Sequence, residues 1–293
     1  MPSSERLSVL KTSKLYIGGR FVRTESGRYL QAKTTDGEHI ANYCWASRKD
    51  LRDAVRVARE AQPGWASASP YLKGQILYRM AEMLEDRCET FVAEILRQSA
   101  GDRTAAEREV TAAVDRLVYF AGWSDKVTAI FGSVNPVSTP HFNFTVPEPT
   151  GVVGLLSPDT PCLLGFVSML GASLVMGNAI VAVVSETQAL PGATFGEVLA
   201  TSDVPAGLVN ILTGKREELA SVMGSHMDVN AIVAAVSDVA TRQVLGESVA
   251  TNLKRIHFVD IVEDEDWYGQ AGEDPYQILH TTEMKTTWHP VGG

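Results

Sequence analysis

Residues 151–186 have the sequence GVVGLLSPDTPCLLGFVSMLGASLVMGNAIVAVVSE, and the rest of the fold follows from their pattern. An apolar run at Val152–Leu156 precedes a Pro-containing turn, a helix rich in small residues and a second apolar run at Ile180–Val184. Two short apolar strands joined by a crossover helix form a parallel βαβ unit. We therefore predict a parallel sheet built on this unit.

Further apolar runs follow the unit, and a helical pattern separates each from the next. They lie at Leu208–Leu212, Ile232–Val236 and Arg255–Val259. Strands that alternate with helices predict an α/β fold with an open, doubly wound, Rossmann-like parallel sheet. Such sheets bind ligands at the carboxyl ends of their strands.

Apolar stripes at helical spacing predict a helical layer in the first part of the chain. A capping box at Ser47 and Asp50 opens one helix, and Pro63 and Gly64 are expected to stop it. Another helix is expected over residues 104–121. These stripes indicate core packing and not a ligand site.

Residues 132–150 and 284–293 differ in character from the helical layer. Prolines and the alternating segment His141–Val146 favour an extended hairpin that projects from the body. Residues 284–289 are rich in β-branched and aromatic side chains, which predicts a short strand that needs a sheet edge to pair with.

The region between these elements is acidic. Residues 260–274 contain seven Asp or Glu residues and no Lys or Arg. We predict that residues 261–283 form a solvated linker. An acidic docking segment is the alternative, which no other feature of the sequence favours.

Composition bounds the function class. The net charge of -9 and the pI near 5.2 argue against nucleic acid or an anionic membrane as a partner. No apolar run is long enough to cross a bilayer, and residues 1–14 lack the apolar core of a secretory signal. Three scattered cysteines fit a reducing, cytoplasmic location, and neither they nor the histidines have the spacing of a metal site.

Several separate segments together resemble the aldehyde dehydrogenase superfamily, specifically its N-terminal cofactor-binding half with its oligomerisation elements. The matching segments are Leu15–Phe21, Pro63–Trp65, Tyr119–Lys126, Pro147–Leu156, Gly177–Asn178, Pro205–Gly214 and Asn252–Arg255. The resemblance implies a nucleotide-binding domain over residues 1–131 and 151–260. It also implies an oligomerisation arm over 132–150 and 284–293. Residues 261–283 stand where the family has its catalytic domain and nucleophilic Cys.

The resemblance places inert residues at the family's catalytic positions. Thr160 aligns with the Asn that binds the oxyanion, and Asp159 beside it would repel that oxyanion. Met169 aligns with a Lys, and Val259 aligns with the general-base Glu. Asp260 is one residue further along the strand, so it faces the opposite side. We therefore expect no catalytic residue.

Cys162 is a candidate replacement for the nucleophile because it opens a helix, where a thiol pKa can fall. A small buried thiol packed on the sheet is the favoured interpretation. No His or Glu is predicted beside Cys162, and Asp159 would raise its pKa.

The resemblance also indicates a damaged cofactor site. Val183 and Val184 replace a Lys and a Pro of the family's adenosine-binding strand, whereas Ser185 and Glu186 remain. We expect NAD binding to be lost or weak.

The matching phosphate turn is altered as well. Val236 replaces a Gly, Ser237 remains, and Asp238 adds a negative charge where phosphates would lie. Asp238 is also a good helix N-cap. Ser185, Glu186 and Ser237 are thus the remnants of a cofactor site.

Two functions are weighed. The first is a non-catalytic subunit that assembles through residues 132–150 and 284–293 with a full-length aldehyde dehydrogenase paralogue. The family arm adds strands to a neighbour's catalytic-domain sheet, and this chain keeps the arm without that sheet. The second is an NAD(P)-dependent oxidoreductase or adenosine-nucleotide-binding module with a rebuilt site. Its candidate residues are Thr160, Cys162, Glu186, Ser237 and Asp260.

Overall fold

A seven-stranded sheet forms the centre of the computed structural model, which describes residues 9–261 and 263–292. Its strand order is β12-β11-β8-β9-β10-β2-β3. The parallel strands are β8 (Val152–Leu156), β9 (Ala179–Val183), β10 (Val209–Leu212), β11 (Ala231–Ala234) and β12 (Arg255–Phe258). The chain runs outward from β8 in both directions, which confirms the predicted doubly wound sheet. The switch point lies between β8 and β11.

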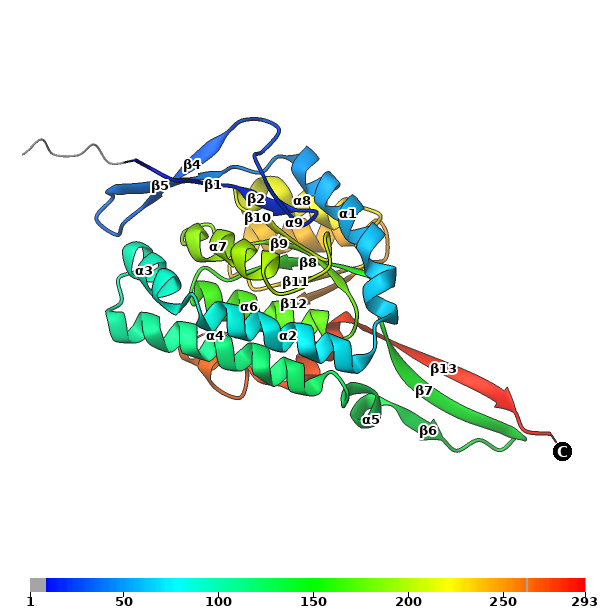
Figure 1. Cartoon of the computed structure of the whole chain (residues 1–293). Helices are drawn as coiled ribbons and strands as arrows, with labels where there is room; N and C mark the ends of the chain where they lie inside the picture. Colours follow the sequence, from blue (N-terminus) through cyan, green and yellow to red (C-terminus); the bar gives the residue numbers. More distant parts are fainter. Residues whose placement is uncertain (1–8, 262, 293) are drawn as a thin grey trace, which may run out of the picture.

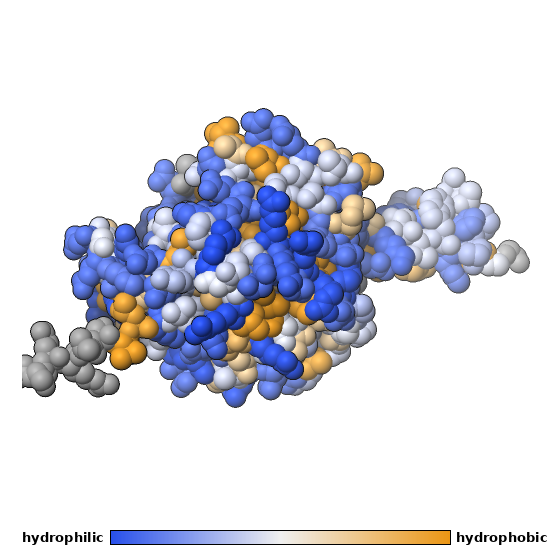
Figure 2. Space-filling view, turned by 90° about the horizontal axis from the view of Figure 1, so that it is seen from above, coloured by the Kyte–Doolittle hydropathy of each residue, from blue (hydrophilic) through white to orange (hydrophobic). Residues whose placement is uncertain are grey.

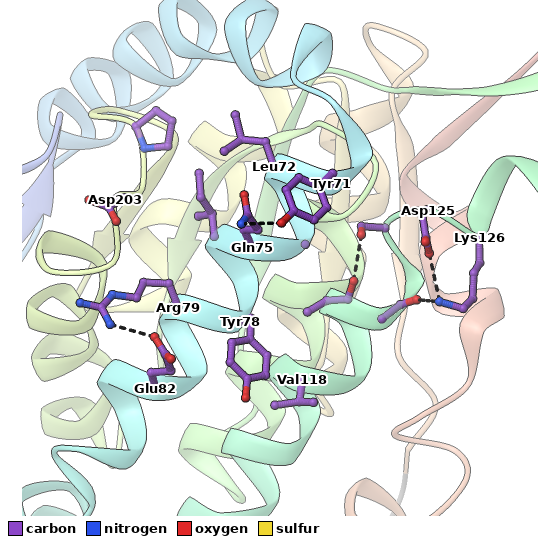
Figure 3. A pocket seen from close by; sticks show the side chains of 16 residues that line it. Tyr71, Leu72, Gln75, Tyr78, Arg79, Glu82, Val118, Asp125, Lys126 and Asp203 are labelled. Carbon is purple, nitrogen blue, oxygen red and sulfur yellow. Dashed lines mark hydrogen bonds and ion pairs between the residues drawn. The ribbon is translucent and has the colours of Figure 1, made fainter.

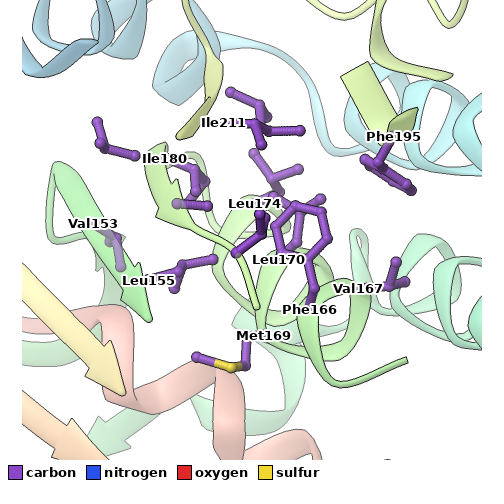
Figure 4. Packing of buried hydrophobic residues seen from close by; sticks show 14 of the residues in the cluster. Val153, Leu155, Phe166, Val167, Met169, Leu170, Leu174, Ile180, Phe195 and Ile211 are labelled. Carbon is purple, nitrogen blue, oxygen red and sulfur yellow. The ribbon is translucent and has the colours of Figure 1, made fainter. Parts of the chain in front are cut away.

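Helices cover both faces of this sheet (Figure 1). The helices are α1 (Arg48–Ser67), α2 (Pro70–Glu85), α3 (Cys88–Gln98), α4 (Arg103–Trp123), α5 (Val127–Phe131), α6 (Cys162–Leu174), α7 (Ala189–Ala200), α8 (Arg216–Ser225) and α9 (Val239–Ala250). Helices α1, α8 and α9 lie on one face, and α6 and α7 lie on the other, with α2–α4 outside them. Every residue of α6 is buried, and Phe166, Leu170 and Leu174 pack beneath the strands (Figure 4).

Helix α1 begins as predicted and ends later than predicted. Ser47 and Asp50 form the capping box. The helix nevertheless continues through Pro63 to Ser67, so the predicted stop is wrong. The Trp65 side chain explains the extra turn, because it is 2% exposed and its indole N–H donates to Leu174 O at 2.9 Å. This anchor offsets the backbone hydrogen bond that Pro63 cannot make.

The N-terminal region adds a hairpin and a small sheet. Strands β2 (Leu15–Ile17) and β3 (Arg20–Val22) turn through Gly18 and Gly19, whose φ angles are 63° and 76°. The second sheet has the order β1-β5-β4 and consists of β1 (Thr12–Ser13), β4 (Tyr29–Lys33) and β5 (His39–Cys44). The sequence analysis did not anticipate this sheet, because its strands lack regular apolar alternation.

A three-stranded arm projects from the body in both views (Figure 1, Figure 2). It has the order β13-β7-β6 and consists of β6 (Ser133–Asn135), β7 (His141–Pro149) and β13 (Thr282–Pro290). Strand β13 pairs antiparallel with β7 from Thr282 opposite Pro149 to Pro290 opposite His141. The arm thus contains the expected hairpin and closing strand. Residue 293 lies outside the described residues.

We call residues 263–281 the covering segment. The prediction that they form a solvated linker is wrong. They form two 3-10 helices, η1 (Asp264–Tyr268) and η2 (Pro275–Thr281). Trp267 and Ile278 are buried against the main core. Residue 262 of the predicted linker lies outside the described residues.

Basic side chains of α4 explain why this acidic segment is ordered. The buried Arg116 guanidinium donates to Trp267 O and Ser168 Oγ, each at 2.8 Å, and to Gly272 O. Arg108 forms a two-pronged ion pair with Glu265 at 2.7 and 2.8 Å. These partners lie far apart in sequence, so local composition could not reveal them.

Among the described helices, none is both long and apolar enough to cross a bilayer.

Candidate functional site

A crevice opens at the carboxyl ends of β8, β11 and β12, beside the switch point of the sheet. Its volume is about 450 Å³. Its lining residues come from the turns after these strands, from the starts of α8 and α9, and from the covering segment. They are Pro158, Asp159, Thr160, Arg216, Ala235, Val236, Ser237, Asp238, Thr241, Arg242, Val259, Asp260, Ile261, Asp264 and Trp267. The described lining contains no Cys, His or Glu.

An ion pair between Asp159 and Arg216 lies along one wall of the crevice. Two guanidinium nitrogens each donate to a different Asp159 oxygen at 2.8 Å, and one also donates to Ser157 O at 2.7 Å. Burial raises the pKa of Asp159, but the Arg216 charge and hydrogen bonds outweigh burial and leave the pKa below its usual value. Arg216 therefore neutralises the charge that the sequence analysis treated as free to repel an oxyanion.

The same carboxylate holds the two predicted cofactor residues at the end of β9. Asp159 Oδ1 accepts from Ser185 Oγ and from the Glu186 N–H, both at 2.9 Å. The Glu186 carboxylate accepts from Lys215 Nζ and, at 3.1 Å, from the Arg216 N–H. Ser185 and Glu186 thus already have partners within the chain.

Lys215 and Arg216 are site residues that the sequence analysis missed. They follow β10, whose neighbour in the sheet is β9. A usable signal existed, because residues that follow adjacent parallel strands meet at one edge of the sheet. Opposite charges after β9 and β10 therefore indicated an ion pair there.

The third predicted cofactor residue, Ser237, lies exposed in the turn after β11. Its neighbour Asp238 caps α9, with Oδ2 accepting from the Thr241 N–H at 2.8 Å. Hydrogen bonding from the Thr241 side chain, and then from its backbone N–H, lowers the pKa of Asp238, so the carboxylate remains charged at this turn. Asp238 therefore caps α9, and its negative charge remains in the turn.

The positions aligned with catalytic groups make structural contacts. Thr160 Oγ1 donates to Asp264 of the covering segment at 3.3 Å. Met169 is buried, and Val259 contributes an apolar side chain to the lining. Asp260 is exposed, and its closest ionic partner is Arg242 at 3.5 Å.

Cys162 is a buried thiol at the start of α6. Burial raises its pKa well above the usual value, and the negative charge of Glu109 raises it further. Glu109 Oε1 accepts from the Leu163 and Leu164 N–H groups at 2.7 and 3.3 Å, so it caps this helix. The sequence analysis was wrong to place Asp159 and no Glu beside this thiol, because α4 brings Glu109 from a distant part of the chain.

Two other features are formed by residues that do not line this crevice. A groove of about 1000 Å³ between α2 and α4 has Tyr71, Leu72, Tyr78 and Val118 among its lining residues (Figure 3). His257 of β12 and His280 of η2 stack with ring centroids 3.3 Å apart. Among the described residues, no three His, Cys, Asp or Glu side chains are grouped to hold a metal ion.

A doubly wound sheet with a crevice at its switch point defines a Rossmann-like fold, which here carries a projecting arm. The aldehyde dehydrogenase family profile matches residues 21–259. The chain therefore belongs to the aldehyde dehydrogenase family.

Individual relatives agree with this assignment. A putative aldehyde dehydrogenase, DhaS, of Bacillus subtilis (strain 168) is 30% identical over 249 residues, which cover 84% of this chain and 50% of the relative. The cytosolic 10-formyltetrahydrofolate dehydrogenase of Xenopus laevis is 29% identical over 277 residues, covering 92% of this chain and 30% of that protein. This chain spans about half the length of the first of these relatives and less of the second.

Solved structures give the same result. PnpE of Pseudomonas sp. WBC-3 is 28% identical with a TM-score of 0.80, and the match covers 85% of this chain and 50% of PnpE. The NAD+ complex of an aldehyde dehydrogenase from Bacillus cereus is 25% identical, with the same TM-score and the same coverage.

Proposed function

We propose that this chain is a non-catalytic aldehyde-dehydrogenase-like subunit that assembles with a full-length aldehyde dehydrogenase and stabilises or positions it. The observation that carries this proposal is the ion-pair network of Asp159, Arg216, Glu186 and Lys215, which engages Ser185 and Glu186 of the former cofactor site. Thr160, Met169 and Val259, at the positions that resemble the family's catalytic ones, support the same conclusion.

The network is expected to weaken NAD binding. The family uses the Glu at the position of Glu186 to bind the adenosine ribose, and here Lys215 and the Arg216 N–H bind that carboxylate. A ribose must displace partners whose charged hydrogen bonds are worth about 1.5–3 kcal/mol each. Asp238 opposes the phosphates of the cofactor as well.

The arm supports the assembly part of the proposal. Among the described strands, β13 pairs with β7 alone, so its outer edge has main-chain groups available for a further strand. Met284 and Trp288 on β13 are exposed. In the family such an arm pairs with the catalytic-domain sheet of a neighbour, and a full-length paralogue would supply that sheet.

Mixing experiments test the assembly. The chain is combined with a full-length aldehyde dehydrogenase from the same cells, and the complex is measured by light scattering after gel filtration. Trp288→Ala is expected to weaken the complex at least tenfold, while Tyr71→Ala on α2, outside the arm, leaves it unchanged. Equal circular dichroism and thermal midpoints for the variants would show that both are folded. Indifference of the wild-type chain to every such paralogue would refute the assembly.

Calorimetric titration with NAD, NADP and AMP tests the cofactor prediction. We expect dissociation constants in the millimolar range or no binding, because the chain's own groups occupy the ribose contacts. The open volume of the crevice favours the second function, a nucleotide-binding module that uses residues such as Thr160, Ser237 and Asp260. Micromolar binding that is lost on Glu186→Gln or Ser237→Ala would establish that module in place of the proposed role.

A further inference from the structure

A second cavity lies between α6, the ends of β11 and β12, and the covering segment. Its volume is about 230 Å³. It borders the crevice, because residues 259–261 line both. We call it the histidine cavity, after the stacked rings of His257 and His280 in its wall.

Three polar side chains in its wall lack hydrogen-bond partners among the described residues. Ser173 of α6 is 2% exposed and lines the cavity, and its hydroxyl has no hydrogen bond to any described residue. The ring nitrogens of His257 and His280 likewise make no hydrogen bond within the described residues. Buried polar groups are normally paired, so the Ser173 hydroxyl indicates that something else enters this space, and the two half-buried rings offer further polar atoms there.

Both rings are held in the neutral form near pH 7. The rings lie nearly parallel, at 9°, with centroids 3.3 Å apart, so two positive charges there would repel strongly. Burial lowers the pKa of His280 to about 4, helped by the nearby His257, while Asp274 opposes this change. Burial also lowers the pKa of His257, and Asp260 opposes it. Neutral imidazoles offer acceptor nitrogens to a donor.

The charge and shape of the lining define the ligand. The lining contains the carboxylates of Asp260 and Asp274 and no Lys or Arg. Arg242 is the nearest described cation to Asp260, at 3.5 Å. The remaining wall includes the apolar side chains of Met169 and Val233. No three His, Cys, Asp or Glu side chains of the described chain are grouped to hold a metal ion, so an organic ligand is favoured.

We propose that the histidine cavity binds a small organic amine, with its ammonium group at the carboxylates and imidazoles and its apolar body against α6 and β11. A cavity of 150 Å³ accommodates benzene, so this volume suits a body with its amine of roughly ten non-hydrogen atoms. The Ser173 hydroxyl would accept a hydrogen bond from the same ammonium group. This site is independent of the proposed subunit role.

Titration of the whole chain with 2-phenylethylamine at pH 7.5 tests the proposal. We expect saturable one-to-one binding, at least tenfold tighter than that of 2-phenylethanol, and no binding of 3-phenylpropionate. In proton NMR spectra, the ring signals of His257 and His280 should shift, and those of His39 and His141 should not. Equal affinities for the three compounds, or no saturation by the amine, would overturn the proposal.

Variants locate the binding. Ser173→Val replaces the hydroxyl in the cavity wall by a methyl group and is expected to abolish binding, and Asp274→Asn is expected to weaken it about tenfold. Asn at position 274 can still accept the Tyr276 N–H that begins η2, so the fold should persist. Asp36→Asn, in the exposed turn between β4 and β5, is the matched control. Unchanged binding by Ser173→Val and Asp274→Asn in folded protein would place the amine elsewhere.

Discussion

At the scale of single residues, Asp159 organises the crevice. Its carboxylate joins the turn after β8 to Arg216 of α8 and to the backbone after β9. One side chain thus ties the ends of neighbouring strands together in a place where the fold usually binds a ligand. The network gives the crevice a structural use that requires no cofactor.

Asp159→Asn tests this use through stability. The variant should unfold about 1 kcal/mol more easily at pH 7, since the pair is partly exposed and solvent screens it. The folded-state pKa of Asp159 is depressed, so its contribution is present above the unfolded value near 4 and is lost as pH falls further. Urea unfolding should therefore show a smaller difference in the free energy of unfolding between wild type and Asp159→Asn at pH 3 than at pH 7. A constant difference would contradict the ion-pair explanation.

The histidine pair predicts a second pH effect. The folded-state pKa of His280 is about 4, below the unfolded value near 6.5, so the unfolded chain binds more protons between these values. Stability should therefore be fully present above pH 6.5 and fall as pH drops toward 4. His280→Phe should reduce this dependence, whereas His289→Phe on the exposed arm should not. Thermal unfolding midpoints of the wild type and both variants at pH 7 and pH 4.5 measure this pH dependence of stability.

Residues whose role depends on local sequence were predictable, and those with distant partners were not. Ser47, Asp50 and Asp238 were correctly expected to cap helices, because a cap is defined within four residues. Glu109 beside Cys162 and His280 beside His257 escaped notice, since the fold alone brings them together.

At the scale of elements, the covering segment depends on α4. Arg116 spans the two, with hydrogen bonds to Ser168, Trp267 and Gly272, and it is almost fully buried. A buried guanidinium that satisfies two carbonyl groups fixes the path of the backbone that carries them. The acidic segment is therefore a packed part of the fold.

Arg116→Met should release this segment. Removing the guanidinium leaves the Trp267 and Gly272 carbonyls without this partner, which we expect to cost about 3 kcal/mol or more. Arg103→Met, on the same helix as Arg116, removes exposed ion pairs with Glu89 of α3 and with Glu107, so it should cost much less stability. Urea unfolding gives both values. Faster hydrogen exchange across residues 264–274 in the first variant alone would localise the effect.

Periodic elements were predicted well and irregular ones poorly. The apolar runs gave the parallel strands to within a few residues, and alternation gave β7 of the arm. The end of α1 was misplaced because Trp65 packs onto Leu174, a contact that its own helix does not specify. The covering segment has no regular spacing of apolar residues, so its acidic composition alone wrongly predicted a solvated linker.

At the scale of the whole molecule, the described chain combines a family sheet, a packed covering segment and a projecting arm. The return from β12 to β13 takes place within residues 259–281, and β13 then pairs with β7 along its full length. Arg255 at the start of β12 donates to Thr282 O, which ties the base of the arm to the sheet. The arm is thus held in a defined position from which it can meet a partner.

The first measurement to make is the native mass of the chain, tagged at Met1 and purified gently from its own cells. The proposed subunit role predicts co-purification of a full-length aldehyde dehydrogenase at a fixed ratio, with the complex weakened by Trp288→Ala. A chain that purifies alone, as a monomer or as an oligomer of itself, would contradict that role.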